Sequence, residues 1–452
     1  MVGPKRAGTT SALVFSVLLM APGNVHAASS SGCAAANRGS LNQTLGAGAT
    51  TSRQVRLDSG DTLALSASGA TVSVNSGDAT PLALIGGAGS TAYKAPATAD
   101  YTFIFEGTQA AGTVSVSCIS AQAEAANSEF LNRRKSLLTA REPDRLRIDR
   151  APTPIANPDK PLGSSVGVDD QGRARNVEFS VSLSELQAAS KGSSKIEPGL
   201  VDFWLEGRMQ NYDSVSAVGA GGGNLGVLYL GTRTMFGPDI MLGALAQLDR
   251  GLESAKYDEA EFAAKGWMFG PYVSMKLGSG IVFDGRAAWG ETQNAVAGTE
   301  IDNSHTGRRL MRGKLTGTRD YQGWKVAPSI GLVYVEDTMR DASTGDAMAA
   351  GTGRVEVVPE VSRRFKVDDK TFFEPKAGVG AFVGFDDLSA LNPTTTDLSG
   401  GDVQLRAQAG FAVGVEDGTN LQATGAVESS AAKSSDNNWT GRLQLNVPLG
   451  KQ

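Results

Sequence analysis

The residues of this sequence with the most chemistry to offer are charged side chains that recur at every second position of otherwise apolar stretches. Arg406 alternates with apolar residues in residues 402–416, and Asp284 and Arg286 do so in residues 281–289. Successive side chains of a β-strand point to opposite faces, so these stretches predict strands with one charged face. Such a face can form cross-strand ion pairs or line a polar conduit. The charges that we expect to face a lumen, without catalytic roles, are Glu206, Arg208, Asp284, Arg286, Lys325, Glu356, Arg406 and Arg442.

Residue types that carry catalysis are scarce. Only one of the two histidines, His305, lies beyond the first 27 residues, which excludes a multi-histidine metal site there. No Ser or Cys nucleophile motif accompanies it. The glycine-rich residues 219–223 lack the Lys-Ser/Thr pair that would hold phosphate. We therefore predict no enzymatic activity, cofactor or metal; hydrolase activity in residues 28–122 is the alternative that an assay would reveal.

The first residues predict a secretory signal. Lys5 and Arg6 precede an apolar core in residues 11–20, and Val-His-Ala at 25–27 has the form of a cleavage site. We predict removal of residues 1–27 by cleavage between Ala27 and Ala28. A membrane anchor is the alternative, but the apolar run is shorter than the roughly 20 residues that span a bilayer.

Residues 28–122 are rich in Ser, Thr, Gly and Ala and contain many short alternating stretches separated by turn signals. This pattern predicts a small β-sandwich. Cys33 and Cys118 bracket it, and in an oxidising compartment a disulfide is the simplest account of the pair. Two unpaired thiols are the alternative. With a net charge of −5, the 452-residue chain has no basic excess that would indicate nucleic-acid binding.

Residues 123–200 predict a helical and proline-rich linker. An amphipathic helix is expected from Ala123 to about Arg141, followed by five prolines between 143 and 161. A second short helix is expected at residues 182–190, just before the first long strand.

Residues 201–452 predict an all-β fold, a transmembrane antiparallel β-barrel of about twelve strands. The alternating stretches are long enough for tilted membrane strands, whereas a soluble sandwich rarely uses so many long strands. The gaps alternate between tight turns and long polar segments, an asymmetry typical of outer-membrane barrels. The long gaps, expected outside the cell, are 211–222, 250–261, 292–305, 337–350, 386–400 and 430–437.

Aromatic residues near the predicted strand ends can form the interfacial girdles of such a barrel. Trp204 instead falls on the polar face of its strand and is expected to point inward. The girdle candidates are Tyr229, Trp267, Tyr272, Trp289, Trp324, Phe365, Phe372 and Trp439.

Several short segments of this region resemble the β-domain of the autotransporters, the type V secretion proteins. The likeness covers roughly Val201 to Leu449, and the order and spacing of the segments carry it. It departs from the family pattern at the end, where Leu449 precedes Gly-Lys-Gln instead of a terminal aromatic, and in the short N-terminal segment. The segments are Phe-Trp-Leu-Glu-Gly-Arg at 203–208, Leu-Tyr-Leu-Gly at 228–231, Gly-Trp-Met-Phe-Gly-Pro-Tyr at 266–272 and Phe-Asp-Gly-Arg-Ala-Ala-Trp-Gly at 283–290.

The resemblance implies an outer-membrane protein whose barrel anchors its own N-terminal passenger and translocates it to the cell surface. The barrel would be inserted by the outer-membrane barrel assembly machinery, and a linker helix, with residues 182–190 as the nearest candidate, would run through the lumen. We expect the passenger, residues 28–122, to bind an extracellular ligand. The alternative is a passive channel or structural envelope protein whose N-terminal domain stays in the periplasm.

Overall fold

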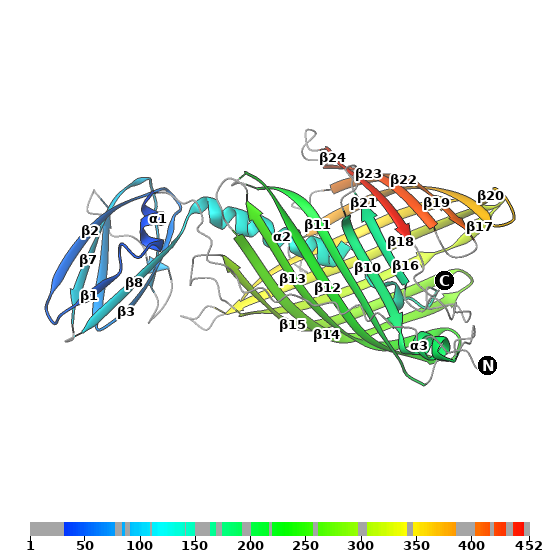
Figure 1. Ribbon diagram of the computed structural model, residues 1–452, viewed down its shortest axis with the longest axis horizontal. Helices are drawn as coiled ribbons and strands as arrows, with labels where there is room; N and C mark the ends of the chain where they lie inside the picture. Colours follow the sequence, from blue (N-terminus) through cyan, green and yellow to red (C-terminus); the bar gives the residue numbers. More distant parts are fainter. Residues whose placement is uncertain are drawn as a thin grey trace, which may run out of the picture.

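The computed structural model consists of an N-terminal β-sandwich and a large β-barrel joined by a helix (Figure 1). The predicted signal segment and the predicted cleavage site between Ala27 and Ala28 lie outside the described residues. The structure describes residues 31–76, 84–85, 91–108, 111–140, 142–149, 163–168, 174–191, 200–216, 219–255, 261–296, 305–340, 347–385, 403–415, 420–430 and 437–446.

The sandwich packs a five-stranded sheet, in the order β1-β8-β3-β6-β5, against a three-stranded sheet, in the order β2-β7-β4. Alternation produces its core, because Tyr101, Phe103 and Phe105 on β7 are fully buried. The predicted disulfide between Cys33 and Cys118 is confirmed and joins helix α1 to β8. The elements are α1 (Ser31–Asn37), β1 (Gln43–Leu45), β2 (Thr50–Leu57), β3 (Thr62–Ser68), β4 (Ala70–Ser76), β5 (Leu84–Ile85), β6 (Thr91–Lys94), β7 (Ala99–Gly107) and β8 (Gly112–Ile119).

Helix α2 (Ala121–Ala140) leaves the sandwich directly, since only Ser120 separates it from β8. Two oxygen atoms satisfy N–H groups of its first turn: the Ser120 hydroxyl accepts from Ala123 N–H at 3.1 Å, and the buried Asp61 carboxylate accepts from Ala121 N–H at 3.2 Å. The helix is therefore joined to the sandwich without a flexible spacer. After it come residues 142–149, which include a 3₁₀ turn, η1 (Asp144–Leu146).

The barrel is a sixteen-stranded antiparallel sheet in which fourteen strands form a closed ring. The last strand pairs with the first through four register pairs, Leu443 to Asn446 with Val168 to Ser165, and β16 pairs with β18. Two short strands, β17 (Arg319–Tyr321) and β20 (Phe365–Lys366), each pair on one side only. The ring strands are β9 (Gly163–Val168), β10 (Ala174–Ser182), β11 (Asp202–Ser216), β12 (Gly219–Phe236), β13 (Ile240–Ala255), β14 (Glu261–Gly278), β15 (Ile281–Val296), β16 (His305–Gly317), β18 (Trp324–Arg340), β19 (Ala347–Ser362), β21 (Thr371–Phe385), β22 (Val403–Val415), β23 (Asn420–Ser430) and β24 (Asn437–Asn446).

The barrel thus begins before Val201, and the ring has two more strands than the expected twelve. β9 and β10 come from residues that the sequence assigned to the linker. β9 has six residues, too few for the long alternating pattern that marked the other strands. After β10, the expected second helix is present as α3 (Leu183–Ser190), which begins with a capping box formed by Ser182 and Glu185.

The two ends of the barrel differ. Tight connections such as residues 237–239, 279–280 and 322–323 lie at one end, the turn end, which also holds residues 183–201 with a short helix. At the other end, the loop end, the gaps between strands range from residues 217–218 to residues 386–402. The predicted asymmetry is present, but several strands extend into the expected loops: β11 continues to Ser216 and β13 to Ala255. Near the loop end apolar side chains give way to glycine and polar residues, so the sequence pattern stops before the strand does.

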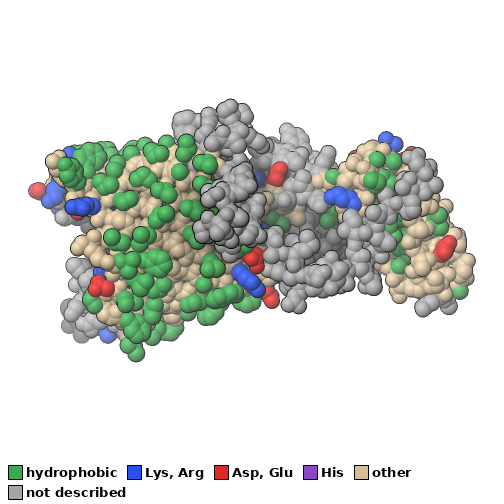
Figure 2. All heavy atoms as spheres, turned by 180° about the vertical axis from the view of Figure 1, so that it is seen from behind, with side chains coloured by type: hydrophobic (Ala, Val, Ile, Leu, Met, Phe, Trp, Pro, Cys, Tyr) green, Lys and Arg blue, Asp and Glu red, His purple; other side chains and the backbone are tan. Residues whose placement is uncertain are grey.

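The outer wall of the barrel carries exposed apolar side chains over a wide band (Figure 2). Trp267, Phe269 and Trp289 are 47–55% exposed, and Leu277 at the turn end is 56% exposed. Trp267 and Leu277 lie on one face of β14, ten residues apart. At about 3.3 Å per residue and a tilt near 40°, the band is roughly 25 Å tall. Among the described residues no helix is long and apolar enough to cross a membrane.

Candidate functional site in the barrel lumen

The barrel lumen contains residues 121–149 of the same chain, which we call the lumen segment. Helix α2 enters at the loop end, beside the sandwich, and runs into the barrel (Figure 1). Its successive residues contact wall residues that lie progressively closer to the turn end. The contacts form layers, and each layer has its own chemistry.

The layer nearest the loop end is apolar. Ala126 and Phe130 of α2 pack against Phe262 and Ala264 of β14, and all four are buried. The rings of Phe130 and Phe262 stack with centroids 6.0 Å apart. This layer fixes the position of the helix where it enters the lumen, because buried aromatic and alanine side chains fit closely.

The next layer consists of three consecutive cations, Arg133, Arg134 and Lys135, which bind acids on the strands β13 and β18. Arg133 Nη1 lies 2.6 Å from each carboxylate oxygen of Glu253 on β13. Lys135 Nζ lies 3.3 Å from Asp337 on β18. Consecutive helical residues point about 100° apart, so three in a row can reach opposite sides of a surrounding wall. The triplet therefore ties the helix to two distant strands at one level.

Arg134 is the centre of this layer, with a side chain that is 1% exposed. Its guanidinium donates to the Asp249 carboxylate, to the Thr292 hydroxyl at 2.6 Å and to the Asn294 amide oxygen at 3.3 Å. Asp249 is itself fully buried and also lies 3.7 Å from Arg308. A buried ion pair of this kind is costly to break, because the remaining charge stays desolvated.

A mixed layer follows. Leu138, Leu146 and Ile148 of the lumen segment belong to an apolar cluster with Trp204, Leu225, Val227, Tyr229, Met241, Leu245, Tyr272 and Val282 of the wall. Beside this cluster, Glu142 accepts a hydrogen bond from Arg286 at 3.0 Å and forms an ion pair with Arg312 at 3.7 Å. Arg312 also donates to the backbone oxygen of Thr139 at 2.6 Å, next to the C-terminus of α2.

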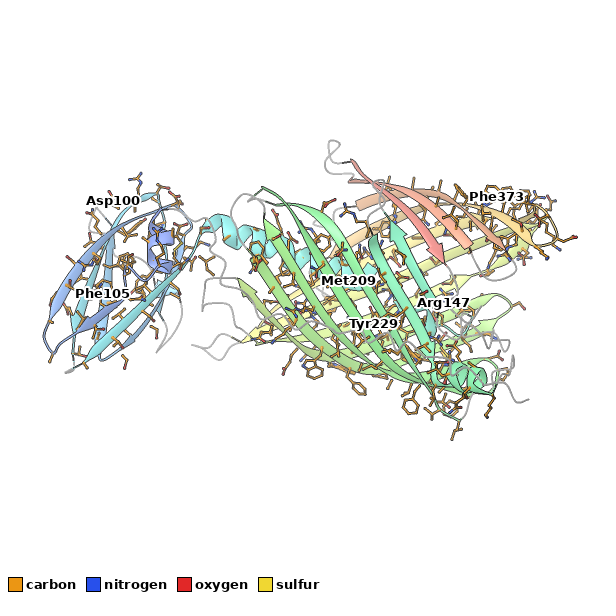
Figure 3. The ribbon with its side chains drawn as sticks, viewed as in Figure 1. Asp100, Phe105, Arg147, Met209, Tyr229 and Phe373 are labelled. Atoms are coloured by element: carbon orange, nitrogen blue, oxygen red, sulfur yellow. A yellow bond between two sulfur atoms is a disulfide. The ribbon has the colours of Figure 1, made fainter. Side chains whose placement is uncertain are left out.

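At the turn end the lumen segment is bound through Arg145, Arg147 and Ile148. Arg147 lies 3.6 Å from Asp284, and Ile148 N–H donates to the Ser274 hydroxyl at 2.9 Å. Arg145 forms a 2.7 Å ion pair with Glu185 of α3. Figure 3 places Arg147 and Tyr229 within the barrel. A cavity of about 150 Å³, lined by Glu142, Pro143, Asp144, Leu146, Arg147, Val273, Asp284, Gly285, Arg286, Arg312 and Lys314, remains beside this part of the segment.

The residues predicted to face the lumen occupy different places. Asp284 and Arg286 bind the lumen segment directly. Arg208 donates to the hydroxyl of buried Tyr229 at 3.0 Å, and Glu206, half-buried, shares its face of β11. Glu356 is buried and lies 3.7 Å from Lys314.

The remaining predicted charges do not contact the segment in this way. Lys325 lies at the turn end and is exposed. Arg406 is half-buried on β22, two residues from Gln408, which donates to Glu360 at 3.2 Å. The side chain of Arg442 lies outside the described residues.

Two expectations about the linker and the aromatic residues require correction. Residues 182–190 do not fill the lumen: α3 lies at the turn end, where Ser184 N–H donates to Asp202 and Leu186 is 46% exposed. The helix that precedes the prolines occupies the lumen instead. Tyr229 and Tyr272, expected in the girdles, are buried in the lumen, where Tyr272 accepts a hydrogen bond from Trp204 Nε1 at 3.3 Å. Trp204 points inward, as expected.

Sequence reasoning missed the wall acids Asp249, Glu253 and Asp337, because they fall at the ends of strands or in segments that were expected to be loops. The triplet Arg133-Arg134-Lys135 was the available signal. Three adjacent cations on one helix require partners on several sides, which a surrounding barrel supplies.

A shallow hollow of about 270 Å³ lies on the sandwich, on the outer side of the five-stranded sheet. Ser66 lies opposite Ser115, and Ser68 opposite Thr113, so hydroxyl groups stand in neighbouring pairs on exposed positions. The lining residues are Asn42, Gln43, Thr44, Ser66, Ser68, Thr113, Val114 and Ser115.

No family model matches the sequence, and no curated protein matches it. Among solved structures, the β-domain of the Bordetella autotransporter BrkA shares 15% identity with a TM-score of 0.38, covering 55% of this chain and 98% of that one. The translocator domain of NalP from Neisseria meningitidis shares 17% identity with a TM-score of 0.34, covering 58% and 93%. The transport unit of AIDA-I from Escherichia coli shares 10% identity with a TM-score of 0.31, covering 72% and 99%. The resemblance inferred from the sequence is thus a distant one.

Proposed function

We propose that this protein is an outer-membrane autotransporter, whose barrel anchors its own N-terminal sandwich at the cell surface after that sandwich has passed through the lumen. The observation that carries the proposal is the continuous path of the chain. The sandwich lies beyond the loop end, the lumen segment runs inward from it, and β9 begins at the turn end, where Gly163 pairs with Ser180. A chain that has crossed its own barrel takes this path.

The wall supports the membrane placement in this proposal. Its apolar band of roughly 25 Å matches the hydrocarbon thickness that outer-membrane barrels cover. The charged side chains that bind the lumen segment point to the inside of the same strands. Apolar residues outside and polar residues inside are the distribution that a membrane barrel requires.

The lumen contacts favour a polypeptide as the transported substance. Layers of ion pairs hold α2, yet Glu142, Asp284 and Lys314 border a cavity rather than a closed apolar core. A hydrated, charged wall can bind many sequences weakly during passage, and then bind the final segment tightly through specific acids. In the barrel we propose no bond-breaking chemistry, since the carboxylates at the lumen segment serve as ion-pair partners.

Cysteine labelling on intact cells tests the orientation. Ser115→Cys places a thiol on the exposed sandwich sheet, and Lys366→Cys places one at the exposed turn end. We expect a membrane-impermeant maleimide to label the sandwich thiol on intact cells, and the turn-end thiol only after the outer membrane is permeabilised. The reverse pattern would support the alternative, a passive channel or structural envelope protein with its N-terminal domain in the periplasm.

We further propose that the sandwich acts by binding. Its hydroxyl-lined hollow has no charged side chain, so it suits an uncharged polar ligand better than an ionic one. Binding of the full-length protein to a panel of neutral glycans would test this role. Loss of binding in Ser66→Val, with retention in Ser52→Val on the other sheet, would assign the ligand to the hollow.

A further inference from the structure

Exposed cations and aromatic rings gather on one part of the turn end, where β17, β18, β20 and β21 meet. We call residues 319–326 and 362–372 the rim sector. Tyr321 pairs with Trp324 across the β17–β18 turn, and Lys325 pairs with Ser362 on β19. The Arg363 guanidinium carbon lies 5.5 Å from the centre of the Trp324 ring and 5.1 Å from that of Phe365. Both rings are 41% exposed.

Most cations of the rim sector have no acidic partner. Within the part of the chain that the structure describes, Arg319, Lys325, Arg363 and Lys366 form no ion pair, in contrast to Arg364, which lies 2.7 Å from Glu374. The N–H donors of these side chains are therefore available to bind an anion. Figure 2 shows Lys and Arg side chains, with Asp and Glu side chains beside them, at the barrel end farthest from the sandwich.

The acids of this part of the rim offset the charge only in part. Asp320 faces Lys325 in register, and Asp368 accepts from the backbone N–H groups of Lys370 and Thr371, which lowers its pKa. Asp369 is exposed. Counting Arg364, Lys370 and Glu374 as well, six cations meet four acids, an excess of two. The sector is positive although the whole chain is negative.

Two of the other connections at this end carry no cation. At the same end, the β12–β13 connection is Gly-Pro-Asp at 237–239 and the β14–β15 connection is Ser-Gly at 279–280, without Lys or Arg. A generic interfacial girdle would distribute cations around the ring. Their concentration beside three exposed aromatic residues indicates a localised site.

We propose that the rim sector binds the phosphate groups of anionic phospholipids in the leaflet at the turn end. Aromatic rings of this kind lie at the headgroup level of a bilayer, and cations there attract anionic lipid. A guanidinium over a ring keeps its edge N–H groups free, and these suit phosphate oxygens. The occupant is a phospholipid because the turn end faces the periplasmic leaflet; this rests on the membrane orientation proposed above.

The test uses the purified full-length protein reconstituted into liposomes of neutral phosphatidylcholine with a minor fraction of phosphatidylglycerol. After extraction into mild detergent, native mass spectrometry counts the lipids of each kind that are retained. The variant Lys325→Ala/Arg363→Ala/Lys366→Ala removes three unpaired cations. Lys276→Ala, an exposed cation on another part of the same rim, is the matched control.

We expect the wild type and Lys276→Ala to retain phosphatidylglycerol in preference to phosphatidylcholine. Each cation removed should lower that preference by about fivefold, the factor that one basic residue near an anionic surface typically contributes. Heat-modifiable migration on a gel verifies that the triple variant is folded. Equal retention of both lipids by the wild type, or an unchanged preference in the folded triple variant, would overturn the proposal.

Two further arms identify the source of the phosphate. Inorganic phosphate at the headgroup concentration should not displace the retained lipid, and lipopolysaccharide should not replace it; displacement by either overturns the phospholipid assignment. Flotation of the liposomes separates this proposal from the functional one. Failure of the protein to insert contradicts the membrane placement, whereas insertion without lipid preference contradicts the rim site alone.

Discussion

The sandwich and the lumen bury their interiors by opposite chemistry. The sandwich core consists of apolar and aromatic side chains, with Tyr101, Phe103 and Phe105 fully buried, and a disulfide joins its two ends. The lumen is filled through layers in which Arg134 meets Asp249 and Glu142 meets Arg286. The sandwich interior is apolar, whereas the lumen alternates apolar layers with layers of buried ion pairs.

The difference fits what each part has to do. An apolar core gains free energy in proportion to the area it removes from water and has no alternative partner outside the molecule. In the charged layers of the lumen each partner can be exchanged for water, so these layers can separate without exposing apolar surface, unlike the apolar layers beside them. Under the function proposed above, the lumen first passes the sandwich and then holds the lumen segment, and charged walls of the second kind suit both steps. The sandwich, once folded, needs to stay folded.

The largest expected effect is in the sandwich. Phe103→Ala should destabilise the sandwich by about 3–5 kcal/mol, since it removes a fully buried ring and leaves a cavity. The barrel should be unaffected, because Phe103 touches none of it. Limited proteolysis of the full-length protein across a urea series measures both parts on one gel. If the barrel lost its resistance to proteolysis at the same urea concentration, the two parts would unfold together. The expected independence of the sandwich and the barrel would then be wrong.

Arg134→Ala should have the next largest effect and act only in the lumen. It leaves Asp249 buried without its main partner, a change that costs about 3 kcal/mol in comparable sites. The segment would then leave the lumen roughly 100-fold more often, at about 1.4 kcal/mol per factor of ten. Conductance in planar bilayers reports such openings. Arg309→Ala, which removes an exposed cation of the outer wall, is the control and should leave the open fraction unchanged.

The barrel could be predicted from sequence because its wall separates lipid from water over most of each strand. Arg406 and its apolar neighbours alternate for that reason, and so do Asp284 and Trp289. Near the loop end this contrast fades, and strands such as β13 resemble polar loops. Asp249 and Glu253 lie at that boundary, so the sequence pattern did not identify them as wall residues. The partners of the basic triplet were missed for this reason.

The local sequence pattern could not predict which helix fills the lumen. Residues 121–140 and 183–190 both form helices, and the apolar residues of the first do not gather on one face as expected, so their pattern does not say which helix a barrel surrounds. The choice depends on wall acids that come from strands far apart in sequence, such as Glu253 and Asp337. The strands β9 and β10 were missed for a related reason, since their short, Ser-rich stretches lie close to the prolines.

Arg133→Ala should have the smallest effect of the three, although Arg133 adjoins Arg134 on the same helix. The Arg133 side chain is 24% exposed, and Glu253 keeps a hydrogen bond from the Tyr212 hydroxyl at 3.1 Å after the change. Water reaches Arg133, and Glu253, although its side chain is 3% exposed, retains a donor, so we expect a loss of about 1 kcal/mol. The same bilayer recordings should show about a fivefold rise in the open fraction.

The effects of the two arginine substitutions should also differ in their dependence on salt concentration. Mobile ions screen a pair that water reaches, so raising the salt concentration should reduce the difference between the wild type and Arg133→Ala. The same change should leave the effect of Arg134→Ala nearly constant, because the Arg134 and Asp249 side chains are at most 1% exposed. If both effects faded together, the lumen would be uniformly hydrated. The ion-pair layer would then hold the segment by many weak contacts rather than by one dry, central pair.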